Sequence, residues 1–477
     1  MLFNSIEFAI FLPIVFFIYW FIFPKKLKLQ NLLIVGASYL FYGWWDWRFL
    51  SLIIFSTFID FTIGFLLKKE QAPIKRKIYL WVSIIINLGF LGFFKYYNFF
   101  IESFTDAFLL FGKQITPNTL NIILPIGISF YTFQTLSYTI DVYKKKLEPT
   151  TNFIAFAAFV SFFPQLVAGP IERATNLLPQ FYKKRHFDYT QAVLGLRQIL
   201  WGLFKKVIIA DNCAKYANII FNDYSDYDSG TLIIGAIFFT FQIYGDFSGY
   251  SDIAIGTSRL FGFDLMQNFA YPYFSRDIAE FWRRWHISLS TWFRDYLYIP
   301  LGGSKGGMKM KIRNTFIIFL VSGFWHGANW TFIFWGFLNA IYFLPLLLQN
   351  KNRVNTNIVA ENSWLPNIKE IIQMLVTFSL TVLAWIFFRA DSLTHAFAYI
   401  SHIFSNKAGT ISLLIPKEIP YLIILFLFIE WLGRKSKFAI EKLQIIPKYL
   451  RWLFYLGLIL LLFLYAGQEQ EFIYFQF

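Results

Sequence analysis

The sequence predicts an all-α, polytopic integral membrane protein, and three observations lead to that prediction. The chain has 477 residues, of which 57% are hydrophobic, 22% are aromatic and only 15% are charged. A soluble chain of this length needs far more polar surface. Apolar runs close to the ~20 residues that cross a bilayer as a helix recur along the chain. The alternating ~10-residue segments typical of a membrane β-barrel do not.

The first 150 residues form the N-terminal group of helices in this prediction. The expected spans are Ile6–Phe23, Leu32–Trp44, Phe49–Leu67, Ile78–Phe94 and Leu124–Ile140. If each run crosses once, three basic segments fall on one side: Lys25–Lys28, Lys68–Lys77 and Lys144–Lys146. Lysine and arginine are enriched in cytoplasmic loops, so we expect these segments in the cytoplasm and the N-terminus outside.

The middle of the chain, residues 151–345, has shorter and more broken apolar runs. Phe153–Pro170 contains two prolines and a glycine, and Leu194–Ala210 contains two lysines. The run Leu232–Tyr244 is followed by GDFSGYSD (Gly245–Asp252), which we expect to interrupt the helix. Irregular backbone and charge at membrane depth are tolerated only inside protein or beside a wet cavity. This third is therefore predicted to hold re-entrant segments that line a cavity.

The remaining residues, 346–477, return to ordinary helices. With Trp330–Leu348 just before them, the expected spans are Ile371–Phe388, Tyr421–Leu432 and Trp452–Ala466. We expect about ten to twelve membrane helices in all, in a single membrane domain covering residues 1–477.

Net charge and cysteine count limit the classes of binding partner and of covalent or metal site. The formal charge is +15, but the basic residues lie in short segments between apolar runs. That pattern favours membrane topology and contact with anionic lipid over nucleic-acid binding. The single cysteine, Cys213, excludes an internal disulfide and a multi-cysteine metal site, and no metal is expected.

Two of the five histidines, His286 and His326, lie 40 residues apart beside tryptophans and glycines. On a helix over Ala279–Asp295, tryptophans share one face and arginines much of the other, with His286 at the border. That helix is either an interfacial anchor with a packing histidine or, through Arg283 and Arg284, a basic wall for an anionic ligand.

His326 follows the apolar run Thr315–Trp325, thirteen residues past Arg313 in the basic loop expected over Lys305–Asn314. At 1.5 Å per residue it lies about 20 Å into a ~30 Å hydrocarbon core. An ionisable side chain there indicates function, and a histidine suits proton abstraction from a hydroxyl. The alternative is a buried histidine hydrogen-bonded to neighbouring backbone. Gly327 and Asn329 suit a helix end just after it.

Long motifs give the sequence a family resemblance. They are FPQLVAGPIERATNLLPQF (Phe163–Phe181), the segment Tyr244–Gly303 with FWRRWHISLSTWFRDYLYIPLGG, SGFWHGANWTFIFWG (Ser322–Gly336), FFRADS (Phe387–Ser392) and FIYFQF (Phe472–Phe477). Together with the opening residues they resemble the membrane-bound O-acyltransferase family, in particular its bacterial branch for alginate O-acetylation. The branch that D-alanylates teichoic acids is a near neighbour.

The resemblance implies a ring of helices around a funnel, with His326 as the catalytic histidine and His286 as a second functional histidine. It also implies an acyl group from a cytosolic thioester such as acetyl-CoA, with no bound cofactor. The acceptor would be an extracytoplasmic polysaccharide reached through a partner protein, at the bacterial inner membrane. The other candidates for the site or channel are Trp325, Asn329, Asp246, Asp252, Glu280, Arg283 and Arg284.

The expected mechanism has His326 deprotonate an acceptor hydroxyl that attacks the thioester, with donors near Asn329 or His286 stabilising the oxyanion. Two alternatives stay open at this point. One is D-alanyl transfer to teichoic acid from a carrier protein. The other is a non-enzymatic exporter of polysaccharide or lipid, with the charged middle third as its pathway.

Overall fold

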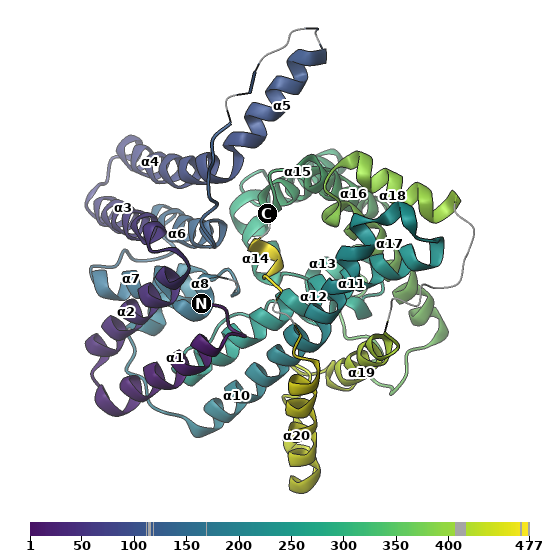
Figure 1. Ribbon diagram of the computed structural model, residues 1–477. Helices are drawn as coiled ribbons and strands as arrows, with labels where there is room; N and C mark the ends of the chain where they lie inside the picture. Colours follow the sequence, from purple (N-terminus) through teal and green to yellow (C-terminus); the bar gives the residue numbers. More distant parts are fainter. Residues whose placement is uncertain are drawn as a thin grey trace. The chain divides into compact units, whose positions relative to one another are not determined.

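A computed structural model describes residues 1–110, 112, 116–117, 119–167, 169–405, 416–467 and 470–475. Ala168, Gln476 and Phe477, which belong to the motifs above, lie outside these residues. Within the described part every regular element is a helix, as expected (Figure 1). The chain forms two compact units, the first comprising residues 1–193 and 257–266 and the second comprising residues 194–256 and 267–477.

The first unit contains most of the N-terminal helices. They are α1 (Ile6–Phe17), α2 (Leu27–Asp46), α3 (Leu50–Lys69), α4 (Pro73–Leu91), α5 (Tyr97–Leu110), α6 (Ile128–Tyr143), α7 (Phe153–Ser161), α8 (Phe163–Leu166) and α9 (Ala174–Leu177). Each of the five predicted N-terminal spans coincides with a helix, and the Phe153–Pro170 run is broken, as predicted.

A buried carboxylate joins three helices of this unit. Asp60 of α3 is fully buried and accepts hydrogen bonds from Asn87 of α4 at 2.9 Å and Thr139 of α6 at 2.9 Å. Ser83 of α4 donates a third hydrogen bond to the same carboxylate. A buried polar group costs little once it is hydrogen-bonded, so this cluster fixes how α3, α4 and α6 pack.

The second unit contains the helices of the middle and end of the chain, apart from the first residues of α10 and the last residues of α12, which belong to the first unit. They are α10 (Tyr189–Leu203), α11 (Asp211–Asn222), α12 (Ser229–Leu260), α13 (Ile278–Arg284), α14 (Ile287–Phe293), α15 (Gly307–His326), α16 (Trp330–Leu348), α17 (Ile368–Arg389), α18 (Leu393–Ser405), α19 (Glu418–Gly433) and α20 (Lys448–Tyr465). A π-helical turn, η5 (Phe204–Ala210), links α10 to α11, and another, η8 (Arg294–Tyr298), follows α14.

The expected interruption at GDFSGYSD is wrong, because α12 runs through it without a break. Gly245 and Gly249 let the α12 backbone approach the α10–η5 backbone: a Cβ at Gly249 would lie 2.8 Å from the Gly202 carbonyl oxygen. Lys206 forms ion pairs with Asp246 at 2.8 Å and with Asp211 at 2.8 Å. The glycines are therefore packing positions, and the charge is compensated inside the unit.

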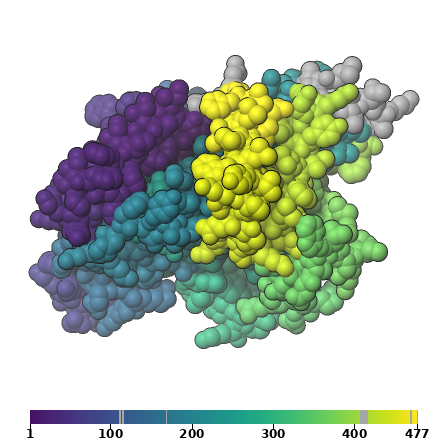
Figure 2. All heavy atoms as spheres, turned by 90° about the horizontal axis from the view of Figure 1, so that it is seen from below, coloured from purple at the N-terminus to yellow at the C-terminus, as the bar shows by residue number. Residues whose placement is uncertain are grey.

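Six segments of the described chain are long and apolar enough to cross a membrane, which makes the protein a multi-pass membrane protein. Ten to twelve were expected. Several of the expected spans fall in shorter apolar helices, such as Ile6–Ile22 and Phe153–Leu166, or in helices interrupted by π turns. Other parts of the protein cover almost none of the last span, α20. The C-terminal residues, yellow in Figure 2, lie open in that view.

Candidate functional site

The helix α15 delivers His326 to the interior. It ends at His326, as predicted, and Gly327 follows it as the C-cap residue. The basic segment before it is not a loop, since Gly307–Asn314 already belong to the helix. Gly323 lies directly against the carbonyl oxygen of Phe332 in α16, so the two helices pack backbone to backbone (Figure 1). His326 is 3% exposed.

Aromatic rings surround His326. The ring centroids of Trp325, Trp335, Phe388 and Tyr474 lie 5.0, 5.2, 5.3 and 5.6 Å from that of the imidazole. They come from α15, α16, α17 and the C-terminal segment. Such a shell excludes water and holds the imidazole in one place.

His286 lies at a break in the polypeptide, and the single helix expected over Ala279–Asp295 is wrong. The helix α13 stops at Arg284, and α14 starts at Ile287. Between them His286 has φ 44° and ψ 55°, in the left-handed region that side chains other than glycine seldom adopt. The segment 268–270 takes up the freed backbone groups: Ala270 N–H donates to Arg284 O, and Ile287 N–H donates to Asn268 O, both at 2.9 Å.

The break turns His286 inward, to within 6.5 Å of His326 between ring centroids. His286 is 1% exposed and lies against Phe247 and Trp325. Burial lowers the pKa of His286 to about 3, because an imidazolium would lose its hydration without gaining a counter-charge. His286 is therefore neutral near pH 7.

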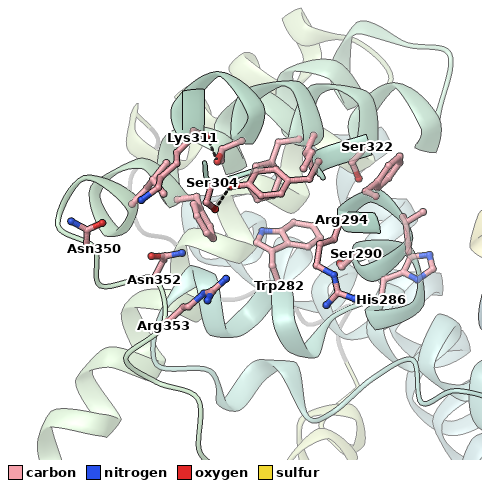
Figure 3. Close-up of a pocket in the computed structure, with 18 of the residues that line it drawn as sticks. Trp282, His286, Ser290, Arg294, Ser304, Lys311, Ser322, Asn350, Asn352 and Arg353 are labelled. Carbon is pink, nitrogen blue, oxygen red and sulfur yellow. Dashed lines mark hydrogen bonds between the residues drawn. The ribbon is translucent and has the colours of Figure 1, made fainter. Parts of the chain in front are cut away.

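Both histidines open onto one cavity of about 560 Å³ (Figure 3). It is lined by Trp282, His286, Leu289, Ser290, Phe293, Arg294, Tyr298, Ser304, Lys311, Thr315, Ile318, Phe319, Ser322, His326, Phe343, Leu347, Asn350, Asn352 and Arg353. Lys311, Thr315, Ile318, Ser322 and His326 share one face of α15. The cavity therefore follows that helix for about 22 Å from Lys311 to His326.

The two ends of the cavity differ in chemistry. In Figure 3, Lys311, Asn350, Asn352 and Arg353 gather at the end away from His286. Arg294 also lines the cavity and pairs with Asp295 at 2.7 Å. No carboxylate is among the described residues that line it. A long cavity with Lys311 and Arg353 at one end and neutral His286, beside the ion-paired Arg294, at the other suits an anionic ligand with a slender arm.

The predicted carboxylates lie outside this cavity. Asp246 accepts from the Ile473 backbone N–H at 2.7 Å, and Asp252 pairs with Lys205 at 2.5 Å. Glu280 is buried between Arg276 and Arg284, to which it is 3.0 and 2.7 Å away. These three acids hold helices and the C-terminal segment in place around the site, and they do not face the two histidines.

The remaining candidates are placed nearby but mostly serve the fold. Arg283 donates to the carbonyl oxygens of Asn352 and Asn355, so it fixes the segment that ends the cavity. Asn329 caps the N-terminus of α16 and donates to Asp391 O at 2.9 Å. Trp325 is buried beside the two histidines, with its ring centroid 6.0 Å from that of His286 and 5.0 Å from that of His326.

Four contributors to the site were not among the residues predicted from the sequence: Asn268, Lys311, Arg353 and Tyr474. Asn268 contacts His286, Lys311 and Arg353 line the cationic end, and Tyr474 packs on His326. The terminal motif FIYFQF, at the far end of the chain from both histidines, was the one signal that could have pointed to Tyr474. Among the residues described, no group of three or more His, Cys, Asp or Glu side chains is arranged to hold a metal ion.

Comparison with known proteins agrees with the resemblance noted in the sequence. Residues 142–388 match the model of the membrane-bound O-acyltransferase family. The chain is 40% identical to the probable alginate O-acetylase AlgI of Pseudomonas aeruginosa, over 85% of this chain and 75% of that protein. It is 36% identical to a peptidoglycan O-acetyltransferase of Helicobacter pylori, over 83% of this chain and 78% of that protein.

A more distant similarity is to a teichoic acid D-alanyltransferase of Streptococcus thermophilus, at 27% identity over 61% of this chain and 75% of that protein. The matched family segment contains both histidines and every helix that lines the cavity along α15. The chain therefore belongs to the membrane-bound O-acyltransferase family and is an O-acyltransferase of the membrane.

Proposed function

We propose that the protein moves an acetyl group from cytosolic acetyl-CoA to a hydroxyl of an extracytoplasmic polysaccharide, with a partner protein completing the transfer. The observation that carries this proposal is the cavity that connects a cationic end to the two buried histidines. Neither the charged donor nor the sugar then has to cross the bilayer. The relatives at 36–42% identity that are named for alginate and peptidoglycan acetylation support the acceptor class.

The cationic end fits the head of the donor. Lys311 and Arg353 supply positive charge where no described lining residue supplies negative charge. Phosphate groups on coenzyme A would pair with them, and the slender pantetheine arm would follow α15 inward. The basic segment at the start of α15 would lie in the cytoplasm, in agreement with the enrichment of lysine and arginine on that side.

At the inner end His326 is proposed as the general base. It takes the proton of the attacking hydroxyl, the hydroxyl oxygen forms a bond to the thioester carbonyl carbon, and the carbon–sulfur bond breaks. The proton on His326 then passes to the leaving thiolate, which returns the imidazole to its neutral form. The aromatic shell around His326 keeps water from hydrolysing the thioester.

The decisive experiment uses membranes that contain the protein and its partner, supplied with radiolabelled acetyl-CoA. We expect label on polysaccharide or partner with the wild type and a loss of at least about 100-fold in His326→Ala. The matched control is His402→Ala, since His402 lies on α18 and lines no part of the cavity. Comparable amounts of folded protein are checked by size-exclusion chromatography. Full activity in His326→Ala would refute the assignment.

A second donor is favoured by one specific observation, the similarity to a teichoic acid D-alanyltransferase. In that case the acyl group arrives on the phosphopantetheine of a carrier protein, and the same cationic end receives its phosphate. Acetyl-CoA would then leave no label on polysaccharide or partner, whereas labelled acyl carrier protein would.

The exporter alternative has no remaining support, because the chain belongs to an enzyme family.

A further inference from the structure

The side chain of Asn268 has a defined orientation. Its Nδ2 donates to Ser251 Oγ at 3.1 Å, and its Oδ1 accepts from the Ser288 backbone N–H at 3.3 Å and from Ser288 Oγ at 2.9 Å. A backbone N–H can only donate, so the atom that faces Ser288 must be the amide oxygen. That oxygen is also 3.0 Å from Nδ1 of His286.

The orientation of Asn268 decides which nitrogen of His286 carries the proton. An amide oxygen can only accept, so Nδ1 must be the protonated nitrogen of the neutral ring. The contact is rigid, because the Asn268 carbonyl oxygen also accepts from the backbone N–H of Ile287, the residue after His286. Backbone and side chain of one residue thus hold the histidine in its left-handed conformation.

The other nitrogen, Nε2, is consequently unprotonated. It is buried, and no described group of the protein forms a hydrogen bond with it. His286 is one of the residues that line the cavity, so its side chain borders the space in which substrate is proposed to lie. Besides His286, the titratable or charged groups among the described residues that line the cavity are Arg294, Tyr298, Lys311, His326 and Arg353, and none of them is a carboxylate. The carboxylates of the adjoining helices are paired: Asp246 and Asp252 of α12 with Lys206 and Lys205, and Glu280 of α13 with Arg276.

We propose that Asn268 is a positioning residue that sets the tautomer of His286, so that Nε2 accepts a hydrogen bond from an O–H or N–H group of the substrate. The inference rests on the proposed function only in placing substrate in the cavity. It replaces the expectation that His286 donates a hydrogen bond to the oxyanion, because an unprotonated nitrogen cannot donate. The substrate group is either the attacking hydroxyl or an amide N–H of the pantetheine arm.

The first test reads the tautomer directly. Full-length protein with ¹⁵N-labelled histidine is studied by NMR in nanodiscs, and the signal of His286 is identified by its loss in His286→Gln. We expect a protonated Nδ1 in the wild type and in Ser288→Ala, the matched control that removes a different donor to the same oxygen. In Asn268→Leu we expect the signal of protonated Nε2 to appear. A protonated Nε2 in the wild type, or an unchanged tautomer in Asn268→Leu, would overturn the inference.

This measurement needs no turnover, so it stands or falls separately from acetyl transfer. If membranes with wild-type protein transfer no acetyl label but Nδ1 is protonated, the proposed function fails and the positioning role remains. If label is transferred but Nε2 is protonated, the proposed function remains and the positioning role fails.

The second test is kinetic. Asn268→Leu removes the acceptor that faces Nδ1 at every pH. Asn268→Asp keeps an acceptor while its side chain is a carboxylate, whereas the protonated acid donates to Nδ1 and moves the ring proton to Nε2. Activity should fall about tenfold or more in Asn268→Leu, and in Asn268→Asp it should fall as the pH is lowered, while His402→Ala stays near wild type. Wild-type activity in Asn268→Leu together with a wild-type pH–rate profile in Asn268→Asp contradicts the proposal.

The split of the kinetic constants identifies the substrate group. A lower kcat with unchanged KM for acetyl-CoA indicates the attacking hydroxyl, whose bond to Nε2 matters in the transition state. A raised KM for acetyl-CoA with kcat unchanged indicates the pantetheine amide.

Discussion

At the scale of single residues, the charged side chains fall into two groups: those that form ion pairs within the fold and those that are proposed to bind the donor. Lys206 is fully buried and lies between Asp211 and Asp246, each at 2.8 Å, and it also donates to the carbonyl oxygen of Gln470 at 3.0 Å. Asp246 in turn accepts from the N–H of Ile473. This network fastens the segment that carries Tyr474 against His326.

Replacing Lys206 by Met should therefore destabilise the protein by about 3–5 kcal/mol, because two carboxylates would remain buried without a cation. Thermal unfolding in detergent measures the change. Lys215→Met is the control, since Lys215 is exposed on α11 and such changes cost at most about 0.5 kcal/mol. Equal melting temperatures for the two variants would contradict the proposed role of the network.

Lys311 is one of the charges proposed to bind the donor. Lys311→Glu should raise the KM for acetyl-CoA about fivefold, or ~1 kcal/mol, because a cation at the cavity end becomes an anion facing phosphate. Lys309→Glu makes the same change two residues away on α15, at a position that does not line the cavity, and should have little effect. Initial rates over a range of acetyl-CoA concentrations decide between them.

The burial of His326 at the end of a helix could be predicted from the sequence, whereas the position of Asn268 beside His286 could not. A histidine at the end of an apolar run is conspicuous, because ionisable groups are rare at membrane depth. Asn268 lies in an irregular segment, and its importance depends on a backbone turn eighteen residues later. Hydrophobic periodicity carries no information about a break that the hydrogen bonds of another segment stabilise.

At the scale of elements, the prediction succeeded where length and apolarity decide and failed where contacts decide. The expected span Trp330–Leu348 coincides with α16, and Ile371–Phe388 falls within α17. GDFSGYSD was expected to interrupt α12 because glycine and aspartate disfavour an isolated membrane helix. In the folded protein the glycines allow close packing against α10 and η5, and Asp246 forms an ion pair with Lys206. The local sequence does not reveal these contacts.

The crossing of α12 with α10 and η5 gives an element-scale prediction. Gly249→Ala should destabilise the protein by about 1–3 kcal/mol, since the added Cβ would lie 2.8 Å from Gly202 O and 3.1 Å from Lys206 N. Gly457→Ala in α20 meets no atom within 4 Å and should be neutral or stabilising by up to about 1 kcal/mol. Detergent melting curves for the pair test this, and a stable Gly249→Ala would mean that the helices can separate without cost.

At the scale of the whole molecule, orientation in the membrane follows from charge. The basic segments Lys68–Lys77 and Lys144–Lys146 are proposed to be cytoplasmic, with the N-terminus outside. The single native cysteine, Cys213, is buried, so a thiol reagent that cannot cross membranes should report only on cysteines that are introduced.

Lys75→Cys and Lys145→Cys should react only after the cells are opened, while Glu102→Cys should react in intact cells, because the positive-inside rule places the first two positions in the cytoplasm. Labelling with such a maleimide, read by gel shift, measures this. Reaction of Lys145→Cys in intact cells would reverse the proposed orientation.

The last helix has a consequence for the environment in which the enzyme works. Protein covers only 6% of the apolar window of α20, so its depth is set mainly by the surrounding lipid. Eighteen residues give it a length of about 27 Å, and the chain that follows it includes Tyr474, in contact with His326. We therefore expect bilayer thickness to influence the proposed catalytic site. Turnover should be highest in vesicles whose acyl chains match α20 and should decline in thinner and thicker ones.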